Sequence, residues 1–213
     1  VEILNSIFTT MDIKKIRAHA PNRDRFVMSK GHGASALYAV MHAHGLMSDA
    51  DIATFHKNGS LLAGHASHFV RFVEHSTGAL GHGLSVGLGM ALGLRSGGGN
   101  ARVFVLVGDG ELNEGSNWEA LMLAGHLKLW NLTLLIDNNG IDQMGRLNDC
   151  CTIDPLRAKL ESFNFSVDEI PGHDEKVIMK ALSKSGDRPR ALICNTTKGK
   201  GVSFMEGNTV WHY

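Results

Sequence analysis

Two almost uninterrupted runs of apolar residues, at 102–107 and 132–137, are the clearest pattern along this chain. Strands that are buried on both faces have this pattern, and such strands are typical of parallel sheets. Shorter apolar runs predict three further strands, at 26–28, 165–169 and 190–196. These five segments predict a sheet with a buried centre.

Between these runs, apolar residues recur at helical spacing, as at Ile3, Leu4, Ile7, Phe8 and Met11. Predicted helices cover residues 1–16, 34–44, 48–57, 78–95, 117–127 and 175–183, and an irregular segment with histidines covers 59–69. Strands and helices alternate along the chain. This order predicts an α/β fold with a doubly wound, mostly parallel sheet and helices on both faces.

A chain of 213 residues is long enough to bury a core and fits one large domain, here 1–213. The chain begins at Val1 inside a predicted helix and without a methionine. We therefore expect the domain to be incomplete at its N-terminus. The chain has no repeats and no obvious linker between domains.

The charge balance and the cysteines narrow the classes of partner and compartment. Lys and Arg total 21, as do Asp and Glu, so the formal net charge is zero. This balance argues against a nucleic acid or a membrane surface as partner. No apolar run approaches the ~20 residues of a membrane span, and no signal peptide is visible. Three cysteines without metal-ligand spacing indicate reduced thiols and a cytoplasmic protein.

Polar motifs follow both of the long apolar runs directly. Gly108-Asp109-Gly110 follows the first run, and Asn138-Asn139 follows the second. Ligands of open α/β sheets bind beyond the carboxyl ends of the strands, where both motifs fall. Carboxylate, amide and phosphate oxygens together suit octahedral Mg²⁺, which would then tie a diphosphate to the protein.

Each motif alone is also a common turn, so the combination carries the prediction. The 27 residues 111–137 separate the two motifs and hold one helix and one strand, as a βαβ unit requires. The other phosphate-binding motifs are absent: the chain has no Gly-x-x-x-x-Gly-Lys-Ser/Thr loop. Its glycine-rich run at 78–93 does not open a helix after a strand in the Gly-x-Gly-x-x-Gly pattern.

With this spacing, the segment GDGELNEGSNWEALMLAGHLKLWNL that begins at Gly108 resembles the transketolase family of thiamine diphosphate enzymes. Further matching segments extend the resemblance over nearly the whole chain. They are DRFVMSKGH at 24–32, AGH at 63–65, TGALGHG at 77–83, KGKGVSFMEG at 198–207 and Trp211-His212.

The resemblance implies a cofactor, thiamine diphosphate, and a metal, Mg²⁺ or in its place Ca²⁺ or Mn²⁺. It implies that the metal ligands are Asp109, Asn139 and the backbone carbonyl of Ile141. Glu114 would lie at a subunit contact near the cofactor, although it also suits an exposed helix start. The remaining implied cofactor contacts are Gly78 and Leu80 at the aminopyrimidine, and Gly108, Gly110 and Glu111 near the diphosphate.

Three histidines carry the family match: His32, His65 and His212. By resemblance they contact the sugar or the reacting centre as proton donors and acceptors. Imidazole suits this role because it titrates near neutral pH. His82 stands where the family commonly has Gln.

The chain departs from the family pattern by lacking both a Ser-Gly-His-Pro-Gly element and the pyrimidine-binding domain with its activating Glu. We therefore expect a partner, a C-terminal transketolase subunit that carries this domain, most simply in an α₂β₂ heterotetramer. The pair would transfer a two-carbon ketol unit from a ketose or its phosphate to an aldose. A truncated full-length enzyme is the other explanation of the missing domain.

Two other classes of function stay open. One is another thiamine diphosphate enzyme, of the deoxyxylulose phosphate synthase type or the alpha subunit of a 2-oxoacid dehydrogenase. The other is a noncatalytic regulatory subunit with the same fold. The Leu-Gly-His-Gly run and the Lys-Gly-Lys-Gly segment favour transketolase over the other enzymes. The intact Asp109 and Asn139 pair argues against a protein that has lost its function.

Overall fold

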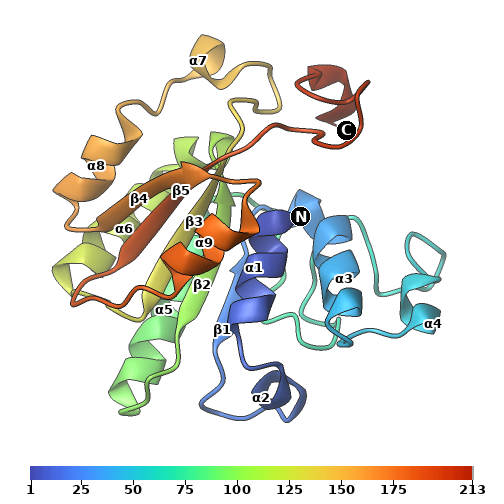
Figure 1. The fold of residues 1–213 in the computed structure, drawn as a ribbon, viewed down its shortest axis with the longest axis horizontal. Helices are drawn as coiled ribbons and strands as arrows, with labels where there is room; N and C mark the ends of the chain where they lie inside the picture. The colour runs from blue at the N-terminus through green and yellow to red at the C-terminus, as the bar shows by residue number, and fades with distance from the viewer. Residues whose placement is uncertain (213) are drawn as a thin grey trace.

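A computed structural model describes residues 1–212 of the chain, with the side chain of His212 left out. Its centre is a five-stranded sheet in the order β1-β2-β3-β5-β4, in which all neighbouring strands are parallel (Figure 1). This confirms the predicted sheet. The strands are β1 (Arg25–Met28), β2 (Val103–Gly108), β3 (Leu132–Asn138), β4 (Ser166–Pro171) and β5 (Arg190–Asn195).

Helices cover both faces of the sheet, as the alternating pattern predicts. The helices are α1 (Glu2–Thr10), α2 (Ile13–Arg17), α3 (Ala34–Ala43), α4 (Asp49–Ile52), α5 (His82–Ser96), α6 (Gly115–His126), α7 (Leu147–Cys150), α8 (Leu156–Ser162) and α9 (Glu175–Leu182). Three short 3₁₀ helices are η1 (Gly31–Gly33), η2 (Gly110–Asn113) and η3 (Thr209–His212).

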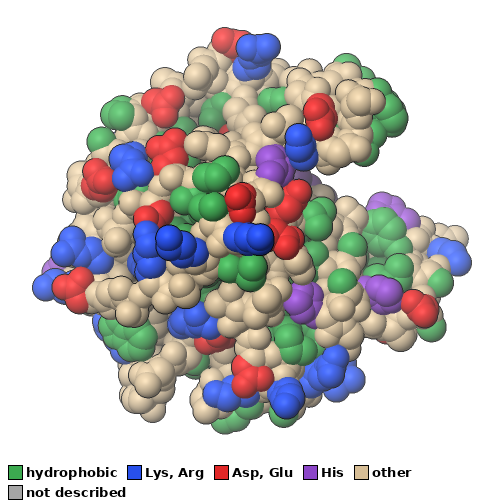
Figure 2. Space-filling model, in the orientation of Figure 1, with side chains coloured by type: hydrophobic (Ala, Val, Ile, Leu, Met, Phe, Trp, Pro, Cys, Tyr) green, Lys and Arg blue, Asp and Glu red, His purple; other side chains and the backbone are tan. Residues whose placement is uncertain are grey.

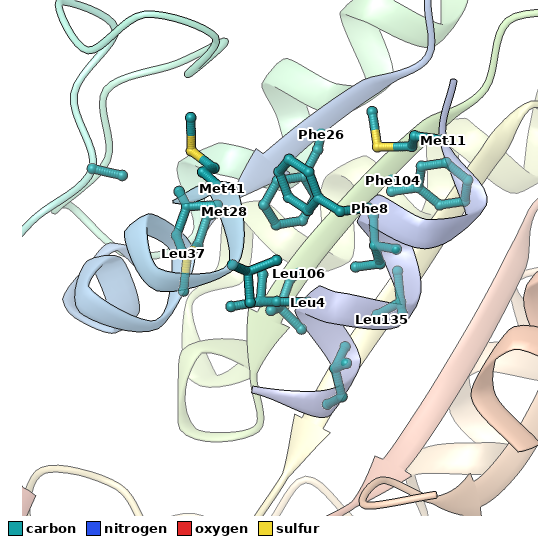
Figure 3. Close-up of a cluster of buried hydrophobic side chains, with 14 of the residues drawn as sticks. Leu4, Phe8, Met11, Phe26, Met28, Leu37, Met41, Phe104, Leu106 and Leu135 are labelled. Atoms are coloured by element: carbon teal, nitrogen blue, oxygen red, sulfur yellow. The ribbon is translucent and has the colours of Figure 1, made fainter. Parts of the chain in front are cut away.

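The strand β2 divides its side chains between two cores. Phe104 and Leu106 point into the cluster with α1, α3 and α9, part of which is drawn in Figure 3. Val103, Val105 and Val107 point into the cluster with α5, α6 and α8. All six residues of β2 are buried, because each face of the strand has its own helical layer.

The register brings the carboxyl ends of the central strands to one edge of the sheet. Gly108 at the end of β2 pairs with Asp137 near the end of β3, and Asp137 pairs with Cys194 in β5. The residues that follow these strands therefore meet at the same edge. This edge is where the sequence predicts a ligand.

The predicted helix 1–16 is wrong, since the structure has two helices there. Met11 is extended with φ −82° and ψ 151°, and the Asp12 side chain accepts hydrogen bonds from the N–H groups of Lys14 and Lys15. Asp12 thus caps a second helix, and this local cap outweighs the continuous apolar spacing.

Two further expected helices are corrected, and two short helices, α7 and α8, were not predicted. The helix predicted at 48–57 spans only Asp49–Ile52, behind a capping box made by Ser48 and Asp51. The helix predicted from residue 78 starts at His82, because Gly81 has φ 84° and cannot continue a right-handed helix backwards. The short helices α7 and α8 have too few residues for their apolar spacing to stand out.

The surface agrees with the balanced composition. Figure 2 shows Lys and Arg side chains interspersed with Asp and Glu, with no large area of one sign on this face. None of the helices in the described chain is both long enough and apolar enough to span a membrane. The cysteines are all free thiols: Cys150 and Cys151 are exposed, and Cys194 is buried.

Candidate functional site

A cavity of about 500 Å³ lies at the carboxyl edge of the sheet. Eleven of the twelve residues that the sequence indicates as site residues line it, and the twelfth, His212, has a side chain outside the described part of the chain. The lining residues are Lys30, His32, His65, Gly78, Leu80, Gly108, Asp109, Gly110, Glu111, Glu114, Asn139, Ile141, Asp142, Gln143, Met144 and Lys198.

Asp109 is almost fully buried, at 1 % exposed, directly after β2. Its carboxylate accepts hydrogen bonds from the backbone N–H of Gly110 at 2.9 Å and from that of Gly140 at 2.5 Å. Burial raises the pKa of the Asp109 carboxyl, although these two hydrogen bonds oppose the shift. No cation lies within ion-pair distance of Asp109 among the described residues. Its charge is therefore only partly compensated.

Asn139 and Ile141 belong to a loop that folds over Asp109. The side-chain oxygen of Asn139 accepts the N–H of Ile141 at 3.1 Å, and Asp142 accepts the N–H groups of Met144 and Gly145 at 2.7 and 2.9 Å. These contacts hold the loop in a tight turn beside the carboxylate.

Gly110 has a steric reason to be glycine. A Cβ atom on Gly110 would lie 2.7 Å from the Cβ of Asp142, closer than carbon atoms approach each other. The second glycine of the Gly-Asp-Gly motif therefore lets the loop with Ile141 pack against the end of β2.

Two lysines that the sequence interpretation did not single out also line the cavity. Lys30 follows β1, and its ammonium donates to Asp137 at 2.5 Å, while Thr196 donates to the other oxygen of Asp137, also at 2.5 Å. Burial alone would raise the pKa of Asp137, but the charge and hydrogen bond of Lys30 hold it below its ordinary value. Lys30 is therefore a paired cation.

Lys198 differs from Lys30 because its ammonium has neither an ion pair nor a hydrogen bond within residues 1–212. It is half-buried and lines the same cavity as Asp109. Burial lowers the pKa of Lys198, and the nearby charge of Lys30 lowers it further. Both lysines lie in segments that match the family, SKGH and KGKG, so the signal to find them was present.

The predicted histidines lie at the rim. His32 in η1 and His65 in the long segment between α4 and α5 both line the cavity with exposed side chains. The backbone carbonyl of His65 accepts a 3.3 Å hydrogen bond from the buried Tyr38 hydroxyl. Glu114 is exposed at the cap of α6, where both of its predicted roles can be met.

Comparison with known proteins identifies the family. The family model described as transketolase, thiamine diphosphate binding domain, matches residues 1–212. The chain belongs to the transketolase family. A relative from Actinobacillus succinogenes, which is named as a subunit of apulose-4-phosphate transketolase, is 39% identical over 100% of the chain and 79% of its own length. A protein of the same name from Phocaeicola vulgatus is 38% identical over 100% of the chain and 77% of its own length.

Solved transketolase structures share the fold. The Campylobacter jejuni enzyme matches 89% of the chain with a TM-score of 0.84 and 34% identity. The Pichia stipitis enzyme in complex with sedoheptulose 7-phosphate matches 97% with a TM-score of 0.85 and 32% identity. The chain spans 31% and 33% of the lengths of these two enzymes. It corresponds to their thiamine diphosphate-binding domain.

The residues of the cavity fit a metal and a diphosphate. The described residues contain no group of three His, Cys, Asp or Glu side chains that could hold a metal by themselves. Mg²⁺ needs no such group, because it commonly takes one or two carboxylates and completes its shell with amide, carbonyl, water and phosphate oxygens. A partly compensated Asp109 and an unpaired Lys198 on one cavity are the charges that a metal and an anion would meet.

Proposed function

We propose that this chain is the diphosphate-binding subunit of a two-chain transketolase. The observation that carries the proposal is a pair of charges without an ion pair on one cavity, the buried Asp109 carboxylate and the half-buried Lys198 ammonium. A divalent cation would neutralise the first, and a diphosphate would neutralise the second. The two apulose-4-phosphate transketolase relatives, which are matched along the whole chain, support the same proposal.

In this proposal Asp109, Asn139 and the carbonyl of Ile141 hold Mg²⁺, and Lys198 binds the diphosphate. Lys30 keeps its ion pair with Asp137 and adds positive potential to the cavity. The backbone at Gly78 and Leu80 borders the aminopyrimidine. Thiamine diphosphate supplies the breaking and forming of a carbon–carbon bond next to a carbonyl group.

The chain's own part in catalysis is orientation and proton transfer. His32 and His65 are exposed at the rim of the cavity, where a polyol can reach both imidazoles. An imidazole side chain can both donate and accept hydrogen bonds at a sugar hydroxyl, so each of these residues suits general acid–base work. His212 is proposed for the same role. The substrates are a ketose or ketose phosphate as donor and an aldose as acceptor.

The proposed partner is a second polypeptide with the pyrimidine-binding domain and its activating Glu. The names of the two relatives describe each as one subunit of an enzyme, which supports a partner chain. An α₂β₂ heterotetramer in the cytoplasm is the simplest assembly. Glu114 is exposed beside the cavity and is available to contact that partner.

A mixing assay tests the proposal. The chain alone, a candidate C-terminal partner alone and their mixture are each supplied with thiamine diphosphate and Mg²⁺, and ketol transfer from a ketose phosphate to an aldose is followed. We expect activity only in the mixture. If the chain binds the cofactor but no partner gives transfer, the enzyme assignment is wrong and a regulatory role is favoured. If the chain does not bind the cofactor with Mg²⁺, the site assignment is wrong as well.

A further inference from the structure

Glu111 has an unusual set of partners for a residue that lines a cavity. Its side chain is 3 % exposed. One carboxylate oxygen accepts hydrogen bonds from the Ser29 hydroxyl and from the backbone N–H of Gly81, the latter at 2.9 Å, and the other accepts the N–H of Gly108 at 3.1 Å. Three donors from three separate segments thus converge on one carboxylate.

Each of these segments continues into residues that line the cavity. Ser29 precedes Lys30, Gly81 follows Leu80, and Gly108 precedes Asp109. The segments come from the end of β1, the start of α5 and the end of β2. The first two are far from Glu111 in the sequence. The Glu111 carboxylate therefore ties together three walls of the site.

Two glycines bring these walls close enough for the tie. A Cβ on Gly83 would lie 2.5 Å from the Cβ of Ser29, and a Cβ on Gly81 would lie 2.6 Å from the Cβ of Glu114. Gly81 also has φ 84°, which favours glycine. The close packing of α5 against β1 and α6 leaves little room for the three segments to shift separately.

The family resemblance places Glu111 near the diphosphate, but a direct contact between the two does not suit these partners. Its oxygens already receive three hydrogen bonds, and two anionic groups in a poorly solvated site repel each other. Interior donors are the natural partners of this carboxylate.

We propose that Glu111 is a positioning residue, which sets the geometry of the cofactor cavity by tying the segments of Ser29, Gly81 and Gly108 together. This inference rests on the proposed function, because the effect is expected on cofactor binding. Partners that orient the groups around a metal typically change affinity or activity by about tenfold to a hundredfold when they are lost. Glu111 is placed to act in this way, because it accepts the N–H of Gly108, the neighbour of the proposed metal ligand Asp109.

The test compares Glu111→Gln with Ser29→Ala and with Asn131→Ala. Gln keeps the size of Glu but replaces one acceptor oxygen with an NH₂ donor. This NH₂ group would face the donor N–H of Gly81 or of Gly108, so one hydrogen bond is lost. Ser29→Ala removes one donor and cannot touch the cofactor. Asn131 is the matched control: it is 1 % exposed and donates to the Ala91 carbonyl at 2.9 Å, at the opposite edge of the sheet.

For each protein the Kd for thiamine diphosphate is measured by calorimetry with saturating Mg²⁺, and the melting temperature is measured without cofactor. We expect Glu111→Gln to raise the Kd about tenfold or more, and Ser29→Ala to raise it by a smaller factor. Asn131→Ala lowers the melting temperature and leaves the Kd unchanged. If the wild type binds the cofactor and Glu111→Gln has the same Kd, the inference about Glu111 is wrong but the proposed function stands. A wild type without binding overturns the proposed function.

Hydrogen exchange tests the tie without cofactor. In Glu111→Gln we expect faster amide exchange together in 29–33, 78–82 and 108–112, with unchanged exchange in β3 and β5. Faster exchange confined to 108–112 would contradict the tie, because the other two walls would then be held independently of Glu111. If Glu111→Gln does not fold, amide exchange in the same three segments is compared between Ser29→Ala and the wild type, with the same expected and contradicting results.

Discussion

The amino ends and the carboxyl ends of the strands form two edges of the sheet, and both carry charged side chains. These charges are partnered differently at the two edges. At the amino ends of the strands the charges are paired within the chain. Arg102 meets Asp24 at 2.6 Å, and Arg190, whose side chain is 5 % exposed, meets Asp168 at 2.7 Å. Arg190 also donates to the carbonyl of Ala181 at 2.6 Å, so its guanidinium has several partners.

At the carboxyl ends, the proposed ligand-binding charges of Asp109 and Lys198 have no opposite charge in contact within the described residues. Lys30 and Asp137 pair with each other, but Asp109 receives only backbone N–H groups. Lys198 has no ion pair within the part of the chain that the structure describes. A buried charge without a partner is costly, so it marks the edge where a ligand is expected to complete the protein.

This difference separates charges that stabilise the fold from charges that serve the site. Changes at the amino edge should alter stability and leave cofactor binding intact. Changes at the carboxyl edge should do the reverse. Four predictions test the separation.

The largest expected effect is at Asp109. Asp109→Ala should raise the Kd for thiamine diphosphate in the presence of Mg²⁺ more than about a hundredfold, because the metal loses its proposed carboxylate ligand. The melting temperature without cofactor should change little, since burial penalises the charge that is removed. Calorimetry with and without Mg²⁺ measures the Kd, and thermal unfolding measures the melting temperature. Asp24→Asn, at the other edge, should show the opposite pattern.

The next effect in size is a loss of stability at the amino edge. Asp168→Ala leaves the buried Arg190 guanidinium without its carboxylate and should lower the free energy of unfolding by about 2 kcal/mol, the usual size of a hydrogen bond between charged groups. Urea unfolding measures this change. Cofactor affinity of the folded variant should match the wild type. An equal loss of affinity would show that the two edges are not independent.

Lys198→Met should weaken cofactor binding about tenfold, because one charged contact to the diphosphate is lost. It should also leave the protein without cofactor as stable as the wild type or slightly more stable, since an unpaired half-buried ammonium is removed. Lys200→Met is the matched control. Lys200 is exposed and pairs with Glu206 only at 3.9 Å, so affinity and stability should both stay unchanged.

The smallest effect is a pH dependence at the amino edge. Burial would raise the pKa of Asp168, but Lys184 and Arg190 lower it below the ordinary value. The folded chain therefore holds this carboxylate ionised to lower pH than the unfolded chain does. Its contribution to stability is complete above about pH 4 and is lost as the pH falls through the lowered pKa. Melting temperatures of the wild type and of Asp168→Asn are measured between about pH 3 and 6. The wild type should melt higher at about pH 6, and the difference should shrink as the pH falls towards about 3.

The strands and the ends of the strands are the part of the fold that the residue pattern predicts well. β2 is apolar throughout, and β3 is apolar up to Ile136 apart from Thr133, as expected for strands that pack between two helical layers. The ends of these strands are visible for the same reason: the apolar run of β2 stops just before Gly108 and Asp109, and that of β3 stops at Ile136, shortly before Asn139. The helix boundaries were predicted less well. The break between α1 and α2 depends on the cap made by Asp12, a local hydrogen bond that apolar spacing does not register.

Some features of this protein follow from its sequence alone, and others are decided only by its tertiary structure. The sequence by itself determined the family, the parallel sheet and the motif residues Asp109 and Asn139, because these depend on residue type and on spacing along the chain. Only the tertiary structure decided that Lys198 is without an ion partner and that Glu111 joins three segments. Such facts depend on distances between residues far apart in the sequence, 82 positions for Ser29 and Glu111, and on burial, which strengthens the interactions between charges.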